Sequence, residues 1–226
     1  MRRAIAALIL ALPIVGTASE LPPPTSDDTT LDVALHFGKS KTVFRYADGN
    51  KADTMLKWFG ASWYERVASR WEIGIFADHM FLTQTDRAAS AGLEPDGYRG
   101  GVSVRGVLLD VAAVQLFVDA AYAYARVHHE SSGQSLVLAW EQPHASLGLA
   151  SRAFGPLRVS AGVTWETIDG QERVNANTSR TTDFDRHHRS GGFIDIDAAV
   201  ENDGYVGAAL RAGTERGGEI YFKKRF

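Results

Sequence analysis

Cysteine is absent from the 226-residue chain, so a disulfide-stabilised scaffold and a lipid-modified cysteine anchor are both excluded. Positive charge is not in excess either, because the formal net charge is -3. Nucleic-acid-binding domains normally carry a basic face, and nucleic acid is therefore not an expected partner. A chain that folds without disulfides must gain its stability from burial and hydrogen bonding.

Long apolar runs are also scarce, and the clearest one opens the chain. Two arginines precede the apolar residues 4–15, and small residues follow them. This is the layout of a secretory signal peptide, too short to cross a bilayer as a helix. We expect residues 1–19 to be a cleaved signal peptide and residues 20–29 to be a Pro-rich periplasmic linker. Residues 30–226 are then the folded domain.

Alternation of apolar and polar residues is what this domain has in abundance. From Leu31 to Phe37 every second residue is apolar, which is the period of a half-buried β-strand. The same pattern recurs along the chain and predicts ten strands, with eight as the alternative because residues 57–64 alternate poorly. The expected strands lie near residues 30–38, 56–66, 70–82, 97–109, 114–127, 143–153, 157–168, 192–201, 205–213 and 218–226.

The connections between these strands fall into two kinds. Tight turns are expected at residues 66–69, 154–156 and 202–204, and long polar loops at residues 39–54, 83–95 and 169–191. Short turns at one end and long loops at the other are typical of transmembrane β-barrels. The pattern therefore favours a closed barrel over a soluble periplasmic β-sandwich, which stays open as an alternative.

Residues 107–127 form the one ambiguous segment, because their length also suits a membrane-spanning helix. As a helix the segment would place Asp110 and Asp119 near the bilayer centre, at about 2.5 to 3.5 kcal/mol each. As two strands it directs Asp119 and Gln115 to one face and the apolar residues to the other. The strand interpretation accommodates the charges, although its turn contains neither Gly nor Pro.

If the apolar faces meet lipid, the opposite faces point into the barrel and form a network of charges. Acids and bases are nearly balanced there, so they can pair across a narrow lumen and fill it, which disfavours a wide pore. A narrow channel remains an alternative. The residues assigned to this lumen network are Asp32, Glu72, Asp78, Arg99, Arg105, Asp119, Arg152, Arg158, Glu166, Asp195, Asp197, Glu201, Arg211, Glu219, Lys223 and Arg225.

The chain ends on "EIYFKKRF", in which Ile220, Phe222 and Phe226 share one face. Together with the expected signal peptide and the alternating strands, this ending resembles the small bacterial outer-membrane β-barrels. The resemblance implies an all-β, transmembrane, antiparallel up-and-down barrel that is monomeric and lies in a Gram-negative outer membrane. It also implies that the barrel assembly machinery recognises the last strand. Lys224 departs from the pattern of such strands, which usually carry an apolar or aromatic residue at this position. The aromatic residues expected at the two membrane interfaces are Tyr64, Trp71, Tyr98, Tyr122, Trp165 and Phe226.

One local motif points to chemistry. In "DRHHRSGG", His188 and Ser190 resemble the His-x-Ser of lipid A deacylases, where Ser is the nucleophile and His the base. Those enzymes carry the motif at the end of the penultimate strand, and residues 211–218 contain neither His nor Ser. Glu201, the candidate acid, falls at the far end of the following strand, roughly 30 Å away. A lipid-modifying enzyme is therefore an alternative, and no catalytic role is expected.

The remaining histidine pairs, at residues 128–129 and 187–188, have no spacing that demands a metal, so no metal and no cofactor is expected. The expected role is structural or interactive, exerted through the long outer loops. In the loop at residues 169–191 we expect Arg173, Arg180, Arg186 and Arg189 to contact the anionic headgroups of lipopolysaccharide.

Overall fold

The computed structural model describes residues 31–226 except for positions 91, 132, 155, 177, 187, 188, 201, 202 and 214. The expected signal peptide and linker lie outside the described residues, as do His188 and Glu201. In the described part no helix is long and apolar enough to cross a membrane.

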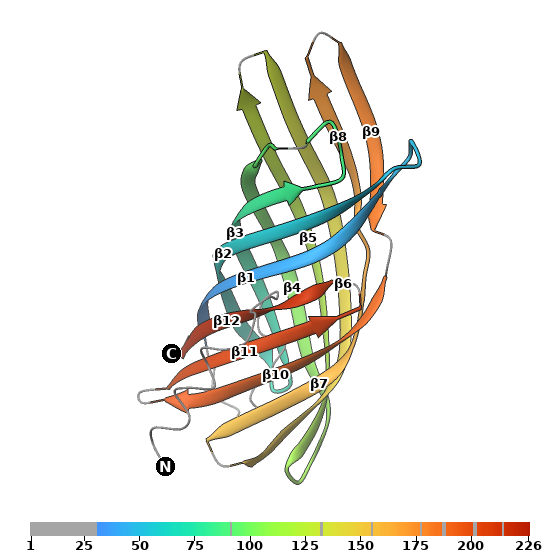
Figure 1. The fold of residues 1–226 in the computed structure, drawn as a ribbon. Coiled ribbons are helices and arrows are strands. Elements are labelled where there is room, and N and C mark those ends of the chain that lie inside the picture. The colour runs from blue at the N-terminus through green and yellow to red at the C-terminus, as the bar shows by residue number, and fades with distance from the viewer. Residues whose placement is uncertain are drawn as a thin grey trace, which may run out of the picture.

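Every regular element is a strand, and the strands pair antiparallel (Figure 1). They are β1 (Leu31–Tyr46), β2 (Lys51–Ala68), β3 (Trp71–Gln84), β4 (Asp96–Val111), β5 (Val114–Ser131), β6 (Gln134–Phe154), β7 (Leu157–Glu166), β8 (Asp169–Asn175), β9 (Ser179–Arg186), β10 (Ser190–Val200), β11 (Gly204–Ala212) and β12 (Arg216–Arg225).

Ten of these strands close into a barrel. The circuit runs β1-β2-β3-β4-β5-β6-β7-β10-β11-β12 and returns to β1 through the β12–β1 pairing. The prediction of an all-β antiparallel barrel of ten strands is therefore confirmed. Phe226 completes the closure, because its backbone N–H donates to the carbonyl of Leu31 at 2.9 Å and its carbonyl accepts from Leu31 at 3.2 Å.

The other two strands, β8 and β9, form a hairpin that the sequence did not predict. β8 pairs with the first half of β6, and β9 pairs with β1 at residues 44–46, beyond the last pair that β12 makes with β1. Two hairpins, β5–β6 and β8–β9, rise above the rest of the wall (Figure 1). At this end β8 and β9 thus occupy the place that β7, β10, β11 and β12 occupy at the other end.

Two of the three predicted long loops are wrong. Residues 39–54 continue β1 and β2 up to a short turn, and residues 169–191 contain β8 and β9. Only the third is largely a loop, with β3 ending at Gln84 and β4 beginning at Asp96. The two wrong segments are rich in charged residues, but those charges alternate with buried side chains such as Phe44 and Phe184.

Residues 107–127 form two strands, as the charge argument favoured. β4 and β5 meet at a turn of two alanines, where Ala112 has φ 54°. A positive φ is unfavourable for a residue with a Cβ, so this turn carries backbone strain that a glycine would not.

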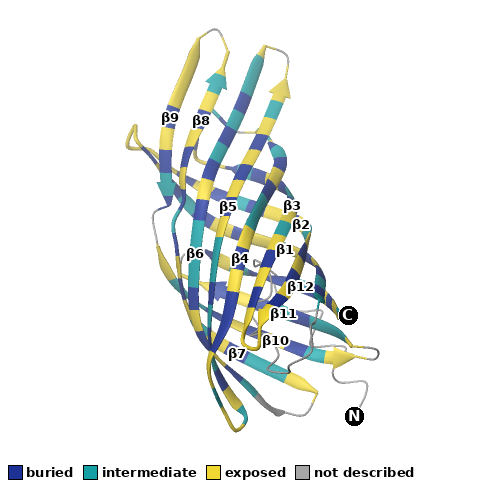
Figure 2. Ribbon diagram, turned by 180° about the vertical axis from the view of Figure 1, so that it is seen from behind, coloured by how far each residue is buried: buried dark blue, intermediate teal, exposed yellow. Residues whose placement is uncertain are grey.

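Exposed and buried positions alternate along the strands (Figure 2). Over part of the outer wall the exposed side chains are apolar and the buried ones mostly polar, and we call this part the apolar belt. On each strand the belt has a clear end. It stops after Phe37 on β1, begins at Phe59 on β2 and stops after Tyr124 on β5. Beyond these points the outward residues are mostly charged or polar, as at Lys39, Lys57 and others along the same strands.

The interior changes in the opposite sense at the same points. Inside the belt it is mainly polar, apart from a small apolar cluster of Phe117, Ala150 and Phe193, whereas beyond the belt it is an apolar core. We call the section around this core the upper barrel. Its buried residues are Phe44, Tyr46, Ala52, Leu56, Trp58, Met80, Leu82, Ala125, Val127, Leu136, Leu138, Trp140, Ile168 and Phe184.

Candidate functional site

The lumen inside the belt is organised around buried ion pairs. Asp78 accepts from His36 Nε2 at 2.5 Å and from Arg99 Nε at 2.7 Å, and all three side chains are buried. These residues come from β1, β3 and β4, and β2 lies between β1 and β3 in the sheet. Because a buried charge is tolerated only when it is paired, this contact ties the three strands together.

The structure places most of the expected lumen residues inside. Arg158 and Arg225 are slightly more exposed, and they pair with Asp197 at 2.8 Å and with Asp32 at 2.9 Å. The side chain of Arg152, like the whole of Glu201, lies outside what the structure describes. The fully buried members are Asp32, Glu72, Asp78, Arg99, Arg105, Asp119, Glu166, Asp195, Asp197, Arg211, Glu219 and Lys223.

A second centre in the lumen surrounds Arg186, which was expected to contact lipid headgroups, and includes the expected lumen residue Glu166. The guanidinium of Arg186 lies 2.5 Å from Glu166 and 3.9 Å from Glu215, and its side chain is fully buried. His144 lies 3.6 Å from Glu166. The expectation that Arg186 contacts lipid headgroups is therefore wrong, because Arg186 points inward at the end of β9.

Little free space remains among these groups. A cavity of about 40 Å³ is lined by His36, Asp78, Arg99, Asp119 and His144, among others. One water occupies roughly 30 Å³ of liquid, so this space accommodates a water molecule or two and no continuous aqueous column. Tyr64, expected at the membrane interface, is also buried here, with the guanidinium of Arg105 3.5 Å from its ring centre.

Above the lumen, the apolar core of the upper barrel fills the interior. Phe44 stacks on Phe184 at 4.7 Å between ring centres, and the ring of Trp140 lies 6.1 Å from that of Phe44. All three rings are buried. An apolar, close-packed interior offers neither water nor ions a favourable path.

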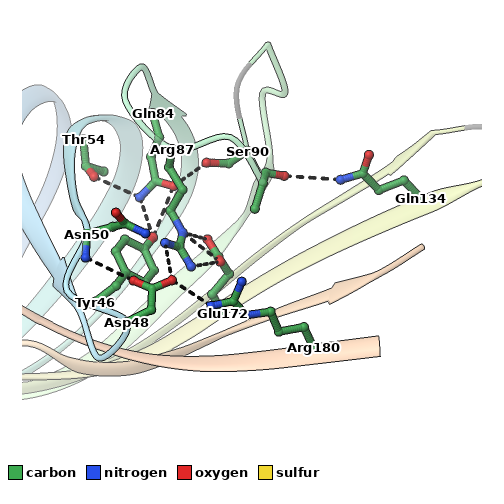
Figure 3. Close-up of polar contacts among 11 residues, drawn as sticks. Tyr46, Asp48, Asn50, Thr54, Gln84, Arg87, Ser90, Gln134, Glu172 and Arg180 are labelled. Atoms are coloured by element: carbon green, nitrogen blue, oxygen red, sulfur yellow. Dashed lines mark hydrogen bonds and ion pairs between the residues drawn. The ribbon is translucent and has the colours of Figure 1, made fainter. Parts of the chain in front are cut away.

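The β3–β4 connection between residues 85 and 95, of which residues 85–90 and 92–95 are described, forms a lid over this core. Arg87 Nε donates to both carboxylate oxygens of Glu172, at 2.8 and 2.9 Å, and a second nitrogen lies 2.6 Å from Glu172 (Figure 3). Arg87 also donates to Asp48 at 3.2 Å, and Asp48 accepts from Arg180 at 2.9 Å. Leu93 packs against the core from above.

Neutral hydrogen bonds continue the same attachment. Gln84 donates to the Tyr46 hydroxyl at 2.8 Å and accepts from Ser90 at 2.6 Å, and Gln134 donates to the carbonyl of Ala89 at 3.2 Å (Figure 3). Contacts from β1, β6 and β8 thus hold the lid closed.

The charges around the lid shift its ionisable groups. Burial raises the pKa of Tyr46, and the nearby Glu172 carboxylate adds to the rise, so this phenol stays neutral. Partial burial works to raise the pKa of Asp48, but hydrogen bonds from Asn50 and Arg87 outweigh it and hold that pKa below its ordinary value. Asp48 therefore remains an anion beside Arg87 at any ordinary pH.

The candidate catalytic and metal-binding residues do not assemble into a site in the described part of the chain. Ser190 is exposed at the start of β10, whereas its candidate partners His188 and Glu201 lie outside the described residues. Among the residues that the structure describes, no cluster of three potential metal ligands occurs.

At the carboxyl end, Phe222 and Phe226 are exposed and Ile220 is half-buried on the same outer face. Lys224 also points outward, with its ammonium 5.8 Å from the ring centre of Phe226.

No protein-family model and no curated protein matches the chain, whereas solved structures do. The outer membrane protease OmpT from Escherichia coli superposes with a TM-score of 0.51 at 13% identity, covering 92% of this chain and 99% of OmpT. The chain has the fold of bacterial outer-membrane β-barrels. At this low identity the likeness concerns the fold alone.

Two further outer-membrane barrels give lower scores. The transport unit of the autotransporter AIDA-I from Escherichia coli matches with a TM-score of 0.41 at 11% identity, covering 91% of this chain and 92% of that one. The Ralstonia pickettii toluene transporter TbuX matches with a TM-score of 0.36 at 9% identity, over 89% and 90%.

Proposed function

We propose that the protein is a monomeric outer-membrane barrel that works at the cell surface as a rigid binding platform. The observation that carries this proposal is the inversion of polarity along continuous strands. Below Phe37 on β1, for example, apolar residues face outward, and above it they face inward. A lipid-facing belt followed by a section with a charged exterior and an apolar core is what a barrel needs to cross a membrane and continue into water.

The filled interior supports a binding role over transport. Among the described residues, the lumen network encloses a cavity of only about 40 Å³, and the apolar core and the lid fill the upper barrel. The surface available for binding is then the exposed outer face of β5, β6, β8 and β9. The barrel assembly machinery, acting on Ile220, Phe222 and Phe226, and lipopolysaccharide are the partners that this proposal implies.

The orientation of the barrel in the membrane provides the direct test. Because the native chain has no cysteine, a single introduced cysteine is the one thiol that a maleimide can label. Thr178 is exposed at the β8–β9 tip, and Arg70 is exposed at the β2–β3 turn of the opposite end. In intact cells, a membrane-impermeant maleimide should label Thr178→Cys. It should label Arg70→Cys only after the outer membrane is permeabilised. Labelling of both variants or of neither in intact cells would overturn the proposed location.

Conductance tests the absence of a passage. The purified protein should give no discrete current steps in planar bilayers, because the interior is filled from the lumen network to the lid. Regular, voltage-independent steps in the native protein would favour the narrow channel and contradict the platform.

A further inference from the structure

Four cations gather on the outer wall just above the belt, on β1, β2 and β12. They are Lys39, Lys41, Lys57 and Arg216, all exposed, and we call them the basic cluster. Lys39 lies directly opposite Lys57 in the β1–β2 register, and Lys41 lies directly opposite Arg216 in the β1–β12 register. Residues directly opposite have their Cβ atoms about 5 Å apart, and like charges in that position destabilise a sheet.

Within the described part of the chain, no ion pair on the protein offsets this repulsion. Among the residues that the structure describes, none of the four forms an ion pair within 4.0 Å. Asp53 lies diagonally across from Lys41 on β2, and Glu215 is buried with its carboxylate 3.9 Å from Arg186. The basic cluster therefore needs an anion from outside the chain.

The position of the cluster indicates what kind of anion. One step down the same strands, Phe37 lies opposite Phe59, with 46% and 48% of these side chains exposed. If the belt crosses the bilayer, as the proposed function requires, the aromatic pair meets acyl chains and the cations lie at the depth of the phosphates. Attraction between surface cations and anionic lipids is worth roughly 1 kcal/mol per cation.

Beside the cluster the wall is hollowed. A pocket of about 700 Å³ is lined by Lys41 and Arg216, by the exposed hydroxyls of Thr85 and Ser190, and by the acids Asp53 and Glu215, among others. Carboxylates and hydroxyls can both accept hydrogen bonds from the hydroxyls of a sugar. Small-molecule sites typically enclose about 300–1,000 Å³. Cations next to several hydroxyls suit a ligand that carries both phosphate and sugar groups.

We infer that the basic cluster and this pocket together bind the phosphorylated sugar headgroup of an outer-leaflet lipid. The phosphate lies between Lys39 and Lys57, where it relieves their repulsion. The sugar occupies the pocket, where Thr85 and Ser190 exchange hydrogen bonds with its hydroxyls. The acyl chains run down the belt past Phe37 and Phe59. Ser190, the exposed serine of the deacylase-like motif, thereby has a binding role and no catalytic one.

Binding of diphosphoryl lipid A to the full-length protein in detergent micelles tests this inference. At about fivefold per cation, the double variant Lys39→Gln, Lys57→Gln should bind lipid A about 25-fold more weakly. The matched control Lys51→Gln, Arg70→Gln removes two exposed cations from elsewhere on the surface and should bind as the native protein does. Equal weakening by both pairs would reduce the effect to net charge and overturn the site.

Two further measurements separate the sugar from the charge and from folding. Thr85→Val, Ser190→Val should weaken binding of lipid A but not of phosphatidylglycerol; equal loss for both lipids would contradict a sugar site. Without lipid, Lys39→Gln should not lower the thermal stability, because it removes a repulsion, and with lipid A the native protein should become the more stable of the two. If the labelling experiment above succeeds while the lysine pair proves neutral, this inference fails and the platform stands.

Discussion

Replacement of Arg87 by Met probes the attachment of the lid most directly. The native guanidinium makes contacts of 2.6 to 2.9 Å with Glu172, and its central carbon lies 3.4 Å from the ring centre of Tyr46. Met preserves part of the side-chain volume but removes the charge. Glu172, only 1% exposed, then has a buried carboxylate without its main partner. Loss of one member of a buried ion pair typically costs about 3–5 kcal/mol.

This free energy should appear in the opening of the lid and leave the barrel folded. Once residues 85–95 detach, water reaches Glu172 and relieves the penalty, and such local opening requires less free energy than global unfolding. Hydrogen exchange in micelles should therefore accelerate by about two orders of magnitude or more in residues 85–95. It should stay unchanged in β11, which is far from the lid in the strand order.

Two variants sharpen the comparison. Arg87→Met, Glu172→Leu removes both charges and should restore much of the protection, since no unpaired charge remains. Arg45→Met breaks an exposed pair with Asp185, whose two side chains are 49% and 30% exposed, and should change protection by no more than about 1 kcal/mol. Native exchange rates in Arg87→Met, or equal effects of Arg87→Met and Arg45→Met, would refute this account of the lid.

Three other outcomes follow from single residues. The folded pKa of Asp48 lies below its ordinary 3.8, so its contact with Arg87 stabilises the lid at any pH above 3.8 and weakens as the pH falls through the folded pKa. Proteolytic protection of residues 85–95 should therefore hold from pH 8 to 5 and decline below about 3.8. Ala112→Gly relieves a positive φ and should raise the free energy of unfolding in urea by roughly 0.5–1 kcal/mol, less if the added freedom of the unfolded chain dominates. Phe226→Ala keeps the backbone hydrogen bonds to Leu31, so refolding into micelles, measured by heat-modifiable gel mobility, should be unaffected while assembly in cells slows. Equal loss in both settings would show that the ring stabilises the barrel and is no assembly signal.

The alternation rule predicted the directions of side chains inside the belt but failed where the surroundings of the barrel change. On β3, for example, the polar side chain of Asp78 points inward and the apolar side chain of Ile75 points outward, as expected. In β8 and β9 the same rule made charged outward residues look like loop residues, although Phe184 faces a core. The available signal was an isolated apolar residue such as Phe184 between charged neighbours, and here the apolar side chain faces inward.

The partners of the buried charges, in the lumen and in the lid, could not be predicted from the sequence. His36 and Asp78 are 42 residues apart, and Arg87 and Glu172 are 85 apart. Which inward residues meet depends on the stagger of the strands around the closed barrel, and the alternation pattern does not determine that stagger. Arg186 shows the consequence. A shift of one residue along β9 would exchange the inward and outward faces, and so decides between a lipid contact and the ion pair with Glu166.

The switch of polarity on β1 and β2 also affects how the strands find their alignment during assembly. Plain alternation penalises a slip by one residue, because every side chain would change faces, but it tolerates a slip by two. Here a slip by two residues would slide Lys39 to the level of Phe37 or bring Phe37 up beside Lys57. A slip of β1 against β2 by an even number of residues would therefore move a charge into the belt or an aromatic ring into water. The switch of polarity at the end of the belt thus selects a single register for the two strands.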